Sequence, residues 1–64
     1  MIFKFIGKDS KLYGFYTNKE YKIIQFGIQN SHFIIYALNE ENKIAIVPYT
    51  SIDKFNDNWE YINE

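Results

Sequence analysis

Short runs of β-branched and aromatic residues recur along the chain, separated by clusters of Gly, Asn, Asp and Ser. This pattern is typical of strands joined by turns, and no longer segment shows the apolar stripe of an amphipathic helix. We therefore predict an all-β fold. Apolar alternation places its five strands over residues 2–6, 20–28, 32–38, 43–47 and 59–62.

The second and third predicted strands carry apolar residues on both faces. In the second, Tyr21 and Ile23 share one face while Ile24 and Phe26 fall on the other. We expect this long strand to bend, with Gly27 as a candidate bulge or kink. The third strand, over 32–38, is apolar throughout, which favours a position in the middle of a closed or sandwiched sheet.

The remaining segments carry turn signals. Residues 7–10 break the first strand, 11–17 form a long excursion, and 39–42 are four polar residues that predict a hairpin loop. Pro48 lacks an N–H group, so we expect it to end the fourth strand. Thr50 and Ser51 are both candidate N-caps, and they predict one short helical or 3-10 turn before the last strand.

The length of 64 residues leaves room for one domain, residues 1–64. A chain this short buries only about 60% of its unfolded surface, and without cysteine it has neither a disulfide nor a cysteine-based zinc site. No apolar run approaches the roughly 20 residues of a membrane span, and the first residues lack the hydrophobic region of a signal peptide. We therefore expect a soluble, cytoplasmic protein.

Four segments resemble small SH3-like proteins of low-GC bacteria and their phages: 5–8, 19–21, 47–52 and 58–60. The resemblance implies a five-stranded SH3-like barrel whose short fifth strand pairs back on the first. It does not extend to the SH3 domains that bind proline-rich peptides. Those carry an acidic first-loop motif and a Trp pair, whereas Trp59 is alone here and Pro48 is followed directly by Tyr49.

Residues for catalysis are missing or isolated. His32 is the only histidine, so no metal or acid-base site can be built from paired imidazoles. Ser and Thr lie at turn positions, and Glu40 and Glu41 adjoin in a polar turn where we expect both to meet solvent. The glycines are dispersed and form no phosphate loop. The sequence therefore predicts no enzyme activity, no cofactor and no metal.

Aromatic residues make up 20% of the chain, more than so small a core can hold. Tyr and Trp are enriched at the energetic centres of protein interfaces, so the surplus predicts a binding surface. The alternative is that these side chains fill the ends of the barrel. The candidate binding residues are Tyr13, Phe15, Tyr16, Tyr36, Tyr49, Trp59 and Tyr61.

Charge is unevenly distributed although the net charge is only -1. The last third is acidic, and Asp53, Asp57 and Glu60 could imitate DNA phosphates on a host protein's basic cleft; the alternative is that they only keep the chain soluble. The first third is basic and could bind nucleic acid through lysines and stacked aromatics. The absence of Arg and the near-neutral charge argue against tight binding of long nucleic acids.

These observations favour a non-enzymatic protein-interaction module. Heavy use of Ile, Asn, Lys, Phe and Tyr matches A/T-rich codons, which suggests a small phage or mobile-element protein that binds and inhibits a host protein in the host cytoplasm. A homodimer is left open. Two alternatives stay open as well: nucleic-acid or small-nucleotide binding, including ligand sequestration by a homo-oligomer, and a structural accessory role in a virion.

Overall fold

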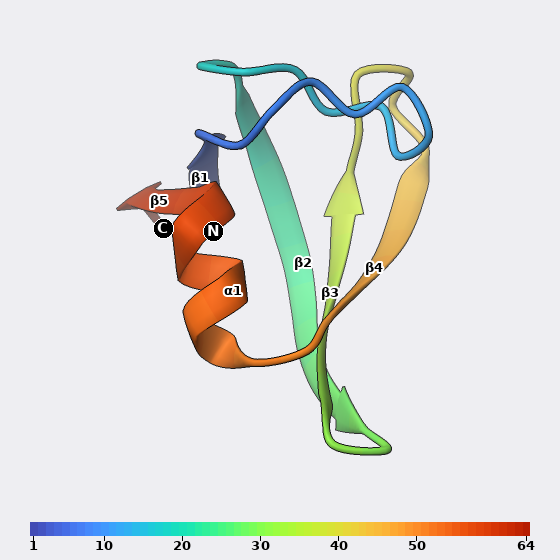
Figure 1. Ribbon diagram of the computed structural model, residues 1–64. Helices are drawn as coiled ribbons and strands as arrows, with labels where there is room; N and C mark the ends of the chain where they lie inside the picture. Colours follow the sequence, from blue (N-terminus) through green and yellow to red (C-terminus); the bar gives the residue numbers. More distant parts are fainter.

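Five antiparallel strands form one sheet in the order β4-β3-β2-β1-β5, and a short helix precedes the last strand (Figure 1). The computed structural model describes residues 1–64. Its elements are β1 (Ile2–Phe5), β2 (Glu20–Gln29), β3 (His32–Leu38), β4 (Ile44–Tyr49), α1 (Ile52–Asn58) and β5 (Trp59–Asn63). The mostly β prediction, with five strands and one helical segment before the last, is confirmed.

The sheet is strongly curved but open. Its two edges, β4 and β5, are not paired with each other, so the predicted closure of the sheet is wrong. The pairing of the last strand with the first is present, with Phe5 opposite Trp59. In Figure 1, β5 and β4 lie on opposite sides of the view, the loop between β1 and β2 runs above the sheet, and α1 lies below β5.

β2 carries the curvature because it pairs with two partners in turn. Its first residues pair with β1, and from Ile23 onward it pairs with β3. The bulge lies at Ile24, since Ile23 is opposite Ala37 while Gln25 is already opposite Tyr36. The predicted bulge at Gly27 is therefore wrong.

The bulge also reverses the predicted orientation of Phe26. One extra residue shifts every later side chain to the opposite face of a strand. Phe26 thus returns to the inner face, where its ring lies 5.6 Å from that of Phe55, while Ile24 stays outside and is 48% exposed.

Pro48 does not end β4, which continues to Tyr49 with Pro48 opposite Ile34. Because β4 is an edge strand, a residue without an N–H group is tolerated where the nitrogen points away from the neighbouring strand. The prediction that the ladder stops at Pro48 is therefore wrong.

α1 begins after Ser51, whose Oγ accepts a hydrogen bond from the Lys54 N–H at 3.2 Å. The cap is thus Ser51, one of the two predicted positions. The helix extends to Asn58, longer than the one short turn that the sequence predicts, and it buries Phe55 while Ile52 stays 57% exposed. No helix of the structure has the length and hydrophobicity needed to cross a membrane.

The core is mainly aromatic. Trp59 is 3% exposed and lies at its centre, with its ring 5.0 Å from the rings of both Phe5 and Phe15. Edge-to-face contacts dominate, which is the favoured geometry for aromatic pairs. The buried hydrophobic residues are Phe3, Phe5, Phe15, Tyr21, Ile23, Ile35, Ala37, Ala45, Val47, Phe55 and Trp59.

Candidate functional site

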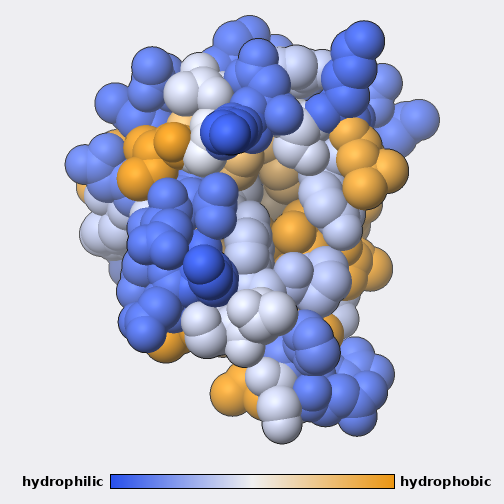
Figure 2. Space-filling view, viewed as in Figure 1, coloured by the Kyte–Doolittle hydropathy of each residue, from blue (hydrophilic) through white to orange (hydrophobic).

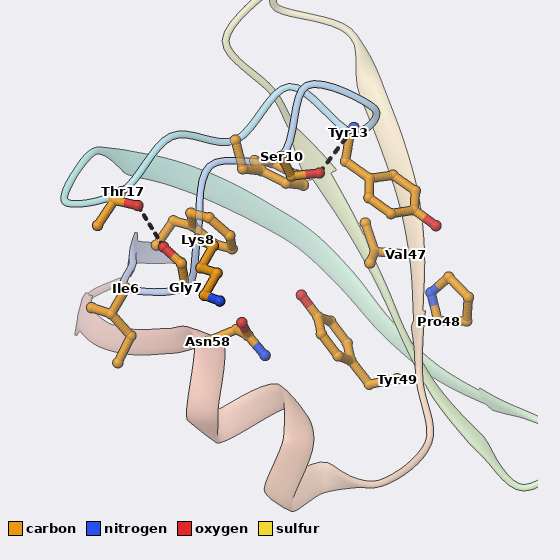
Figure 3. A pocket seen from close by; sticks show the side chains of 12 residues that line it. Ile6, Gly7, Lys8, Ser10, Tyr13, Thr17, Val47, Pro48, Tyr49 and Asn58 are labelled. Atoms are coloured by element: carbon orange, nitrogen blue, oxygen red, sulfur yellow. Dashed lines mark hydrogen bonds between the residues drawn. The ribbon is translucent and has the colours of Figure 1, made fainter.

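The main concave feature is an open pocket of about 700 Å³ between the β1–β2 loop, β4 and the end of α1. In Figure 2, hydrophobic atoms lie recessed in the middle of the face that is viewed here, framed by hydrophilic ones. Figure 3 shows Lys8, Tyr49 and Asn58 directed toward one another across the opening. The lining residues are Phe5, Ile6, Gly7, Lys8, Ser10, Tyr13, Phe15, Thr17, Val47, Pro48, Tyr49 and Asn58.

The β1–β2 loop is held in shape by internal hydrogen bonds. The Thr17 N–H donates to Asp9 Oδ1 at 2.8 Å, and the Thr17 hydroxyl donates to the carbonyl of Gly7. Farther along, Ser10 and Phe15 pair as an isolated bridge. The hydrogen bonds from Thr17 lower the pKa of the Asp9 carboxyl, so its charged form supports this loop.

The β3–β4 loop holds the β1–β2 loop in place through hydrogen bonds. Asn39, at the start of the β3–β4 loop, donates through Nδ2 to the carbonyl of Tyr13 at 2.9 Å, and its Oδ1 accepts from the N–H groups of Glu41 and Lys43. The Glu40 N–H donates to the carbonyl of Gly14 at 2.8 Å. Gly14 has φ +82°, and a Cβ there would stand 2.8 Å from Asn39 Nδ2, so this contact requires glycine.

The Glu40 carboxylate is not free in solvent as the sequence suggested. It accepts a 2.8 Å hydrogen bond from the Tyr21 hydroxyl and a 3.2 Å ion-pair contact from Lys19 Nζ. These contacts lower the pKa of Glu40, with the Tyr21 hydrogen bond the largest cause. Burial, together with the bond to Glu40, raises the pKa of Tyr21 to about 12.

This pair predicts loss of stability at alkaline pH. The pKa of Tyr21 is higher in the folded protein than its ordinary value of 10.0, so the contribution is complete below pH 10.0 and is lost as pH rises toward about 12. Glu40 has the opposite effect. Because its pKa is lowered in the folded protein, the charged carboxylate stabilises the fold at pH values above the ordinary glutamate pKa, and this stabilisation is lost as the pH falls below that value. Urea unfolding across pH should show both slopes.

Tyr21→Phe is the matched variant for these measurements, because it keeps the ring in the core and removes only the hydroxyl. We expect it to flatten the alkaline slope and to weaken the acid slope attributed to Glu40. Identical pH profiles for the two proteins would contradict the assigned role of the Tyr21–Glu40 bond.

Tyr13 and Tyr49 are the half-buried aromatic residues whose side chains line the pocket. The Tyr49 hydroxyl accepts a 2.8 Å hydrogen bond from Trp59 Nε1, which fixes its ring at the pocket wall. Burial raises the pKa of Tyr49, so the hydroxyl stays neutral and can still donate to a ligand.

The other candidate aromatics lie elsewhere. Phe15 is 1% exposed and forms part of the pocket floor, and Trp59 is buried behind the wall without lining it. Tyr16 is half-buried within the β1–β2 loop, and Tyr36 lies on the outer face of β3. Tyr61 is 51% exposed on β5, where it packs on Phe3 and donates to Glu64.

The pocket lining is positively charged, because Lys8 is its only ionic residue. On α1, Lys54 lies four residues before the pocket residue Asn58 and thus on the same side of the helix. The candidate acidic residues Asp53, Asp57 and Glu60 are exposed and do not line the pocket. The sequence did not point to Ile6, Gly7, Lys8 or Asn58 as neighbours of Tyr49, since they come from segments far apart.

Apolar side chains, hydroxyl groups and one ammonium group line the pocket and offer contacts for binding. Nowhere in the structure do three His, Asp or Glu side chains come close enough to hold a metal ion. No protein-family model matches the chain, and comparisons with curated proteins and with solved structures found no match.

Proposed function

We propose that the chain is a non-enzymatic protein-interaction module that binds a segment of a host protein in the pocket and thereby inhibits that protein. The observation that carries the proposal is the open pocket of about 700 Å³ with Tyr13 and Tyr49 on its walls. Binding pockets are typically about 300–1,000 Å³, mostly apolar, with a few polar groups that fix orientation.

The arrangement of the elements supports the finer fold proposal. An SH3-like barrel of the kind found in low-GC bacteria and their phages has a long first loop, three meandering strands, and a helical turn before a fifth strand that pairs with the first. The strand order and the position of α1 agree with that arrangement. We therefore propose a partly open SH3-like barrel of phage or mobile-element origin.

The lining also indicates what the partner segment should carry. An apolar side chain would contact Phe15 and Val47 at the floor, and the hydroxyls of Tyr13 and Tyr49 can donate hydrogen bonds. Lys8 has no carboxylate among the other lining residues, so an acidic group on the partner would supply its counter-charge.

The test is capture of partners with pocket variants. Tyr13→Ala combined with Lys8→Glu should weaken binding by at least about tenfold, because an interface loses an aromatic centre and gains an opposing charge. Leu12→Ala is the matched control, since Leu12 adjoins Tyr13, is 84% exposed and does not line the pocket. Binding is measured by co-purification and then by calorimetry with the captured protein.

Equal binding by the pocket variant and the wild type would refute the proposal, provided that circular dichroism shows both folded. Native mass spectrometry of the purified protein tests the nucleotide alternative. A retained nucleotide mass, lost in the same variant, would assign the pocket to ligand sequestration instead. Recovery of the chain in purified virions, with no soluble partner, would favour the structural role.

A further inference from the structure

The free edge of β4 carries backbone groups that nothing in the molecule satisfies. The Asn39 N–H donates to the carbonyl of Lys43, and bonded pairs recur at every second residue of an antiparallel ladder. The hydrogen-bonded pairs between β3 and β4 are therefore 37/45, 35/47 and 33/49. The β4 residues between them, Ile44, Ile46 and Pro48, direct their backbone groups away from β3, toward the free edge. No backbone or side-chain hydrogen bond reaches these outward groups from elsewhere in the chain.

The same three residues also carry exposed apolar side chains. Ile44 is 60% and Ile46 is 55% exposed, and Pro48 is exposed beside them. Figure 2 shows hydrophobic atoms along the border where Figure 1 places β4. Natural edge strands are usually protected by charges, bulges or covering segments, and β4 has no charged residue between its ends.

The pattern on this edge is self-complementary. In an antiparallel pair of two β4 strands with Ile46 opposite its own copy, Ile44 faces Pro48 of the other chain. The two Ile46 residues exchange both of their bonds, and each Ile44 N–H donates to a Pro48 carbonyl. Pro48 has no N–H group, so a register that centres on Ile46 uses every outward N–H of the edge.

The absence of charged residues in β4 permits pairing with a second copy of the same strand. Pairing places no two like charges opposite each other within β4, since the strand reads Ile-Ala-Ile-Val-Pro-Tyr. The nearest charged residue in sequence, Lys43, would come beside the far end of the other strand, which leads into Ser51 and the acidic first turn of α1 at Asp53.

We propose that two copies of the chain associate through β4, with a two-fold axis at Ile46, and so join their five-stranded sheets into one. The pairing brings Ile46 beside Ile46 and Ile44 beside Pro48 on the outer face, next to Tyr36 and Ile34 of β3. The dimer presents two pockets. Pro48 belongs both to the paired edge and to the pocket lining, so the second β4 strand borders the pocket, but the proposed pairing does not require that the pocket binds a protein. Its small area predicts association that depends strongly on concentration.

Cysteine cross-linking tests the register directly, because the natural chain contains no cysteine. In the proposed pair the two Cα atoms at position 46 lie about 5.5 Å apart, within disulfide range. The two Cα atoms at position 44 lie about 14 Å apart, from four residues along the strand and one strand spacing across it, which is too far for a disulfide. Under a glutathione redox buffer, Ile46→Cys should form the covalent dimer at least about tenfold faster than Ile44→Cys.

Two further measurements complete the test. A mixture of Ile44→Cys and Pro48→Cys should form the mixed dimer in preference to either homodimer. In sedimentation velocity the wild type should shift to dimer as concentration rises, and Ile46→Lys should remain monomeric because it sets two ammonium groups opposite each other. Ile44, Ile46 and Pro48 are all exposed, so we expect the variants to fold, and circular dichroism checks this.

Equal cross-linking rates at positions 44 and 46 would overturn the proposal, as would a wild-type protein that stays monomeric at every concentration. A dimer that persists unchanged in Ile46→Lys would also overturn it, because such a dimer must use another surface. Loss of dimer with intact partner binding in the same variant would separate this edge from the pocket.

Discussion

Trp59→Ala is expected to leave most of the protein unfolded at room temperature. The side chain is 3% exposed, and removal of a buried large aromatic residue costs about 3–5 kcal/mol. Domains of this size rarely have more than about 3–5 kcal/mol of stability from one core. The loss is therefore comparable with the total, and far-ultraviolet circular dichroism during urea titration measures it. The rings within contact of Trp59 are Phe3, Phe5, Phe15, Tyr21 and Phe55.

Two matched variants separate packing from hydrogen bonding. Trp59→Phe keeps an aromatic ring but removes the Nε1–H that donates to Tyr49, and should lose less stability than the alanine variant. Tyr61 lies on the same strand but is 51% exposed, so Tyr61→Ala should lower the free energy of unfolding by no more than about 1 kcal/mol. A folded Trp59→Ala protein with near wild-type stability would show that the core is not centred on this residue.

The number and type of the elements could be predicted because each depends on local pattern. The third strand was placed with the bounds it has in the structure, His32–Leu38, since its apolar run is continuous and polar turns flank it. Ser51 was one of two candidate caps, with Thr50, because a hydroxyl side chain before a helical segment can accept from its first N–H groups. Local signals of this kind need no knowledge of distant residues.

Features that depend on pairing could not be predicted in the same way. The bulge at Ile24 exists because β2 must leave β1 and turn toward β3, and neither partner is visible from the local sequence. Pro48 is permitted in β4 only because that strand is an edge. Closure of the sheet was expected from the apolar strands, yet its edges, β4 and β5, are not paired with each other.

The sequence named part of the pocket lining but not its whole composition. The aromatic surplus led to the prediction of a binding surface, and of its candidate residues Tyr13, Phe15 and Tyr49 line the pocket. Phe15 and Trp59 looked equivalent to the two tyrosines in sequence, but both are buried. The difference arises from contacts between distant segments, such as the Trp59–Tyr49 hydrogen bond.

The contact of Asn39 with the β1–β2 loop is the clearest such long-range feature, and Asn39→Ala should weaken it strongly. The variant removes the bond to the Tyr13 carbonyl, 26 residues away, and two bonds within its own loop. Leaving a partly buried carbonyl without a partner costs about 1–3 kcal/mol, which urea unfolding can measure. Because Tyr13 lines the pocket, we also expect partner binding to fall.

Amide hydrogen exchange locates the effect. In Asn39→Ala the Glu40 N–H group should exchange faster than in the wild type, since it donates to the Gly14 carbonyl only while the two loops stay together. Asn42→Gly is the control in the same loop, because Asn42 has φ 61° and glycine accepts that conformation without strain. If both variants match the wild type in stability and in the exchange rate of the Glu40 N–H, Asn39 does not hold the β1–β2 loop in place. The Tyr13 side of the pocket must then be fixed by packing against the core alone.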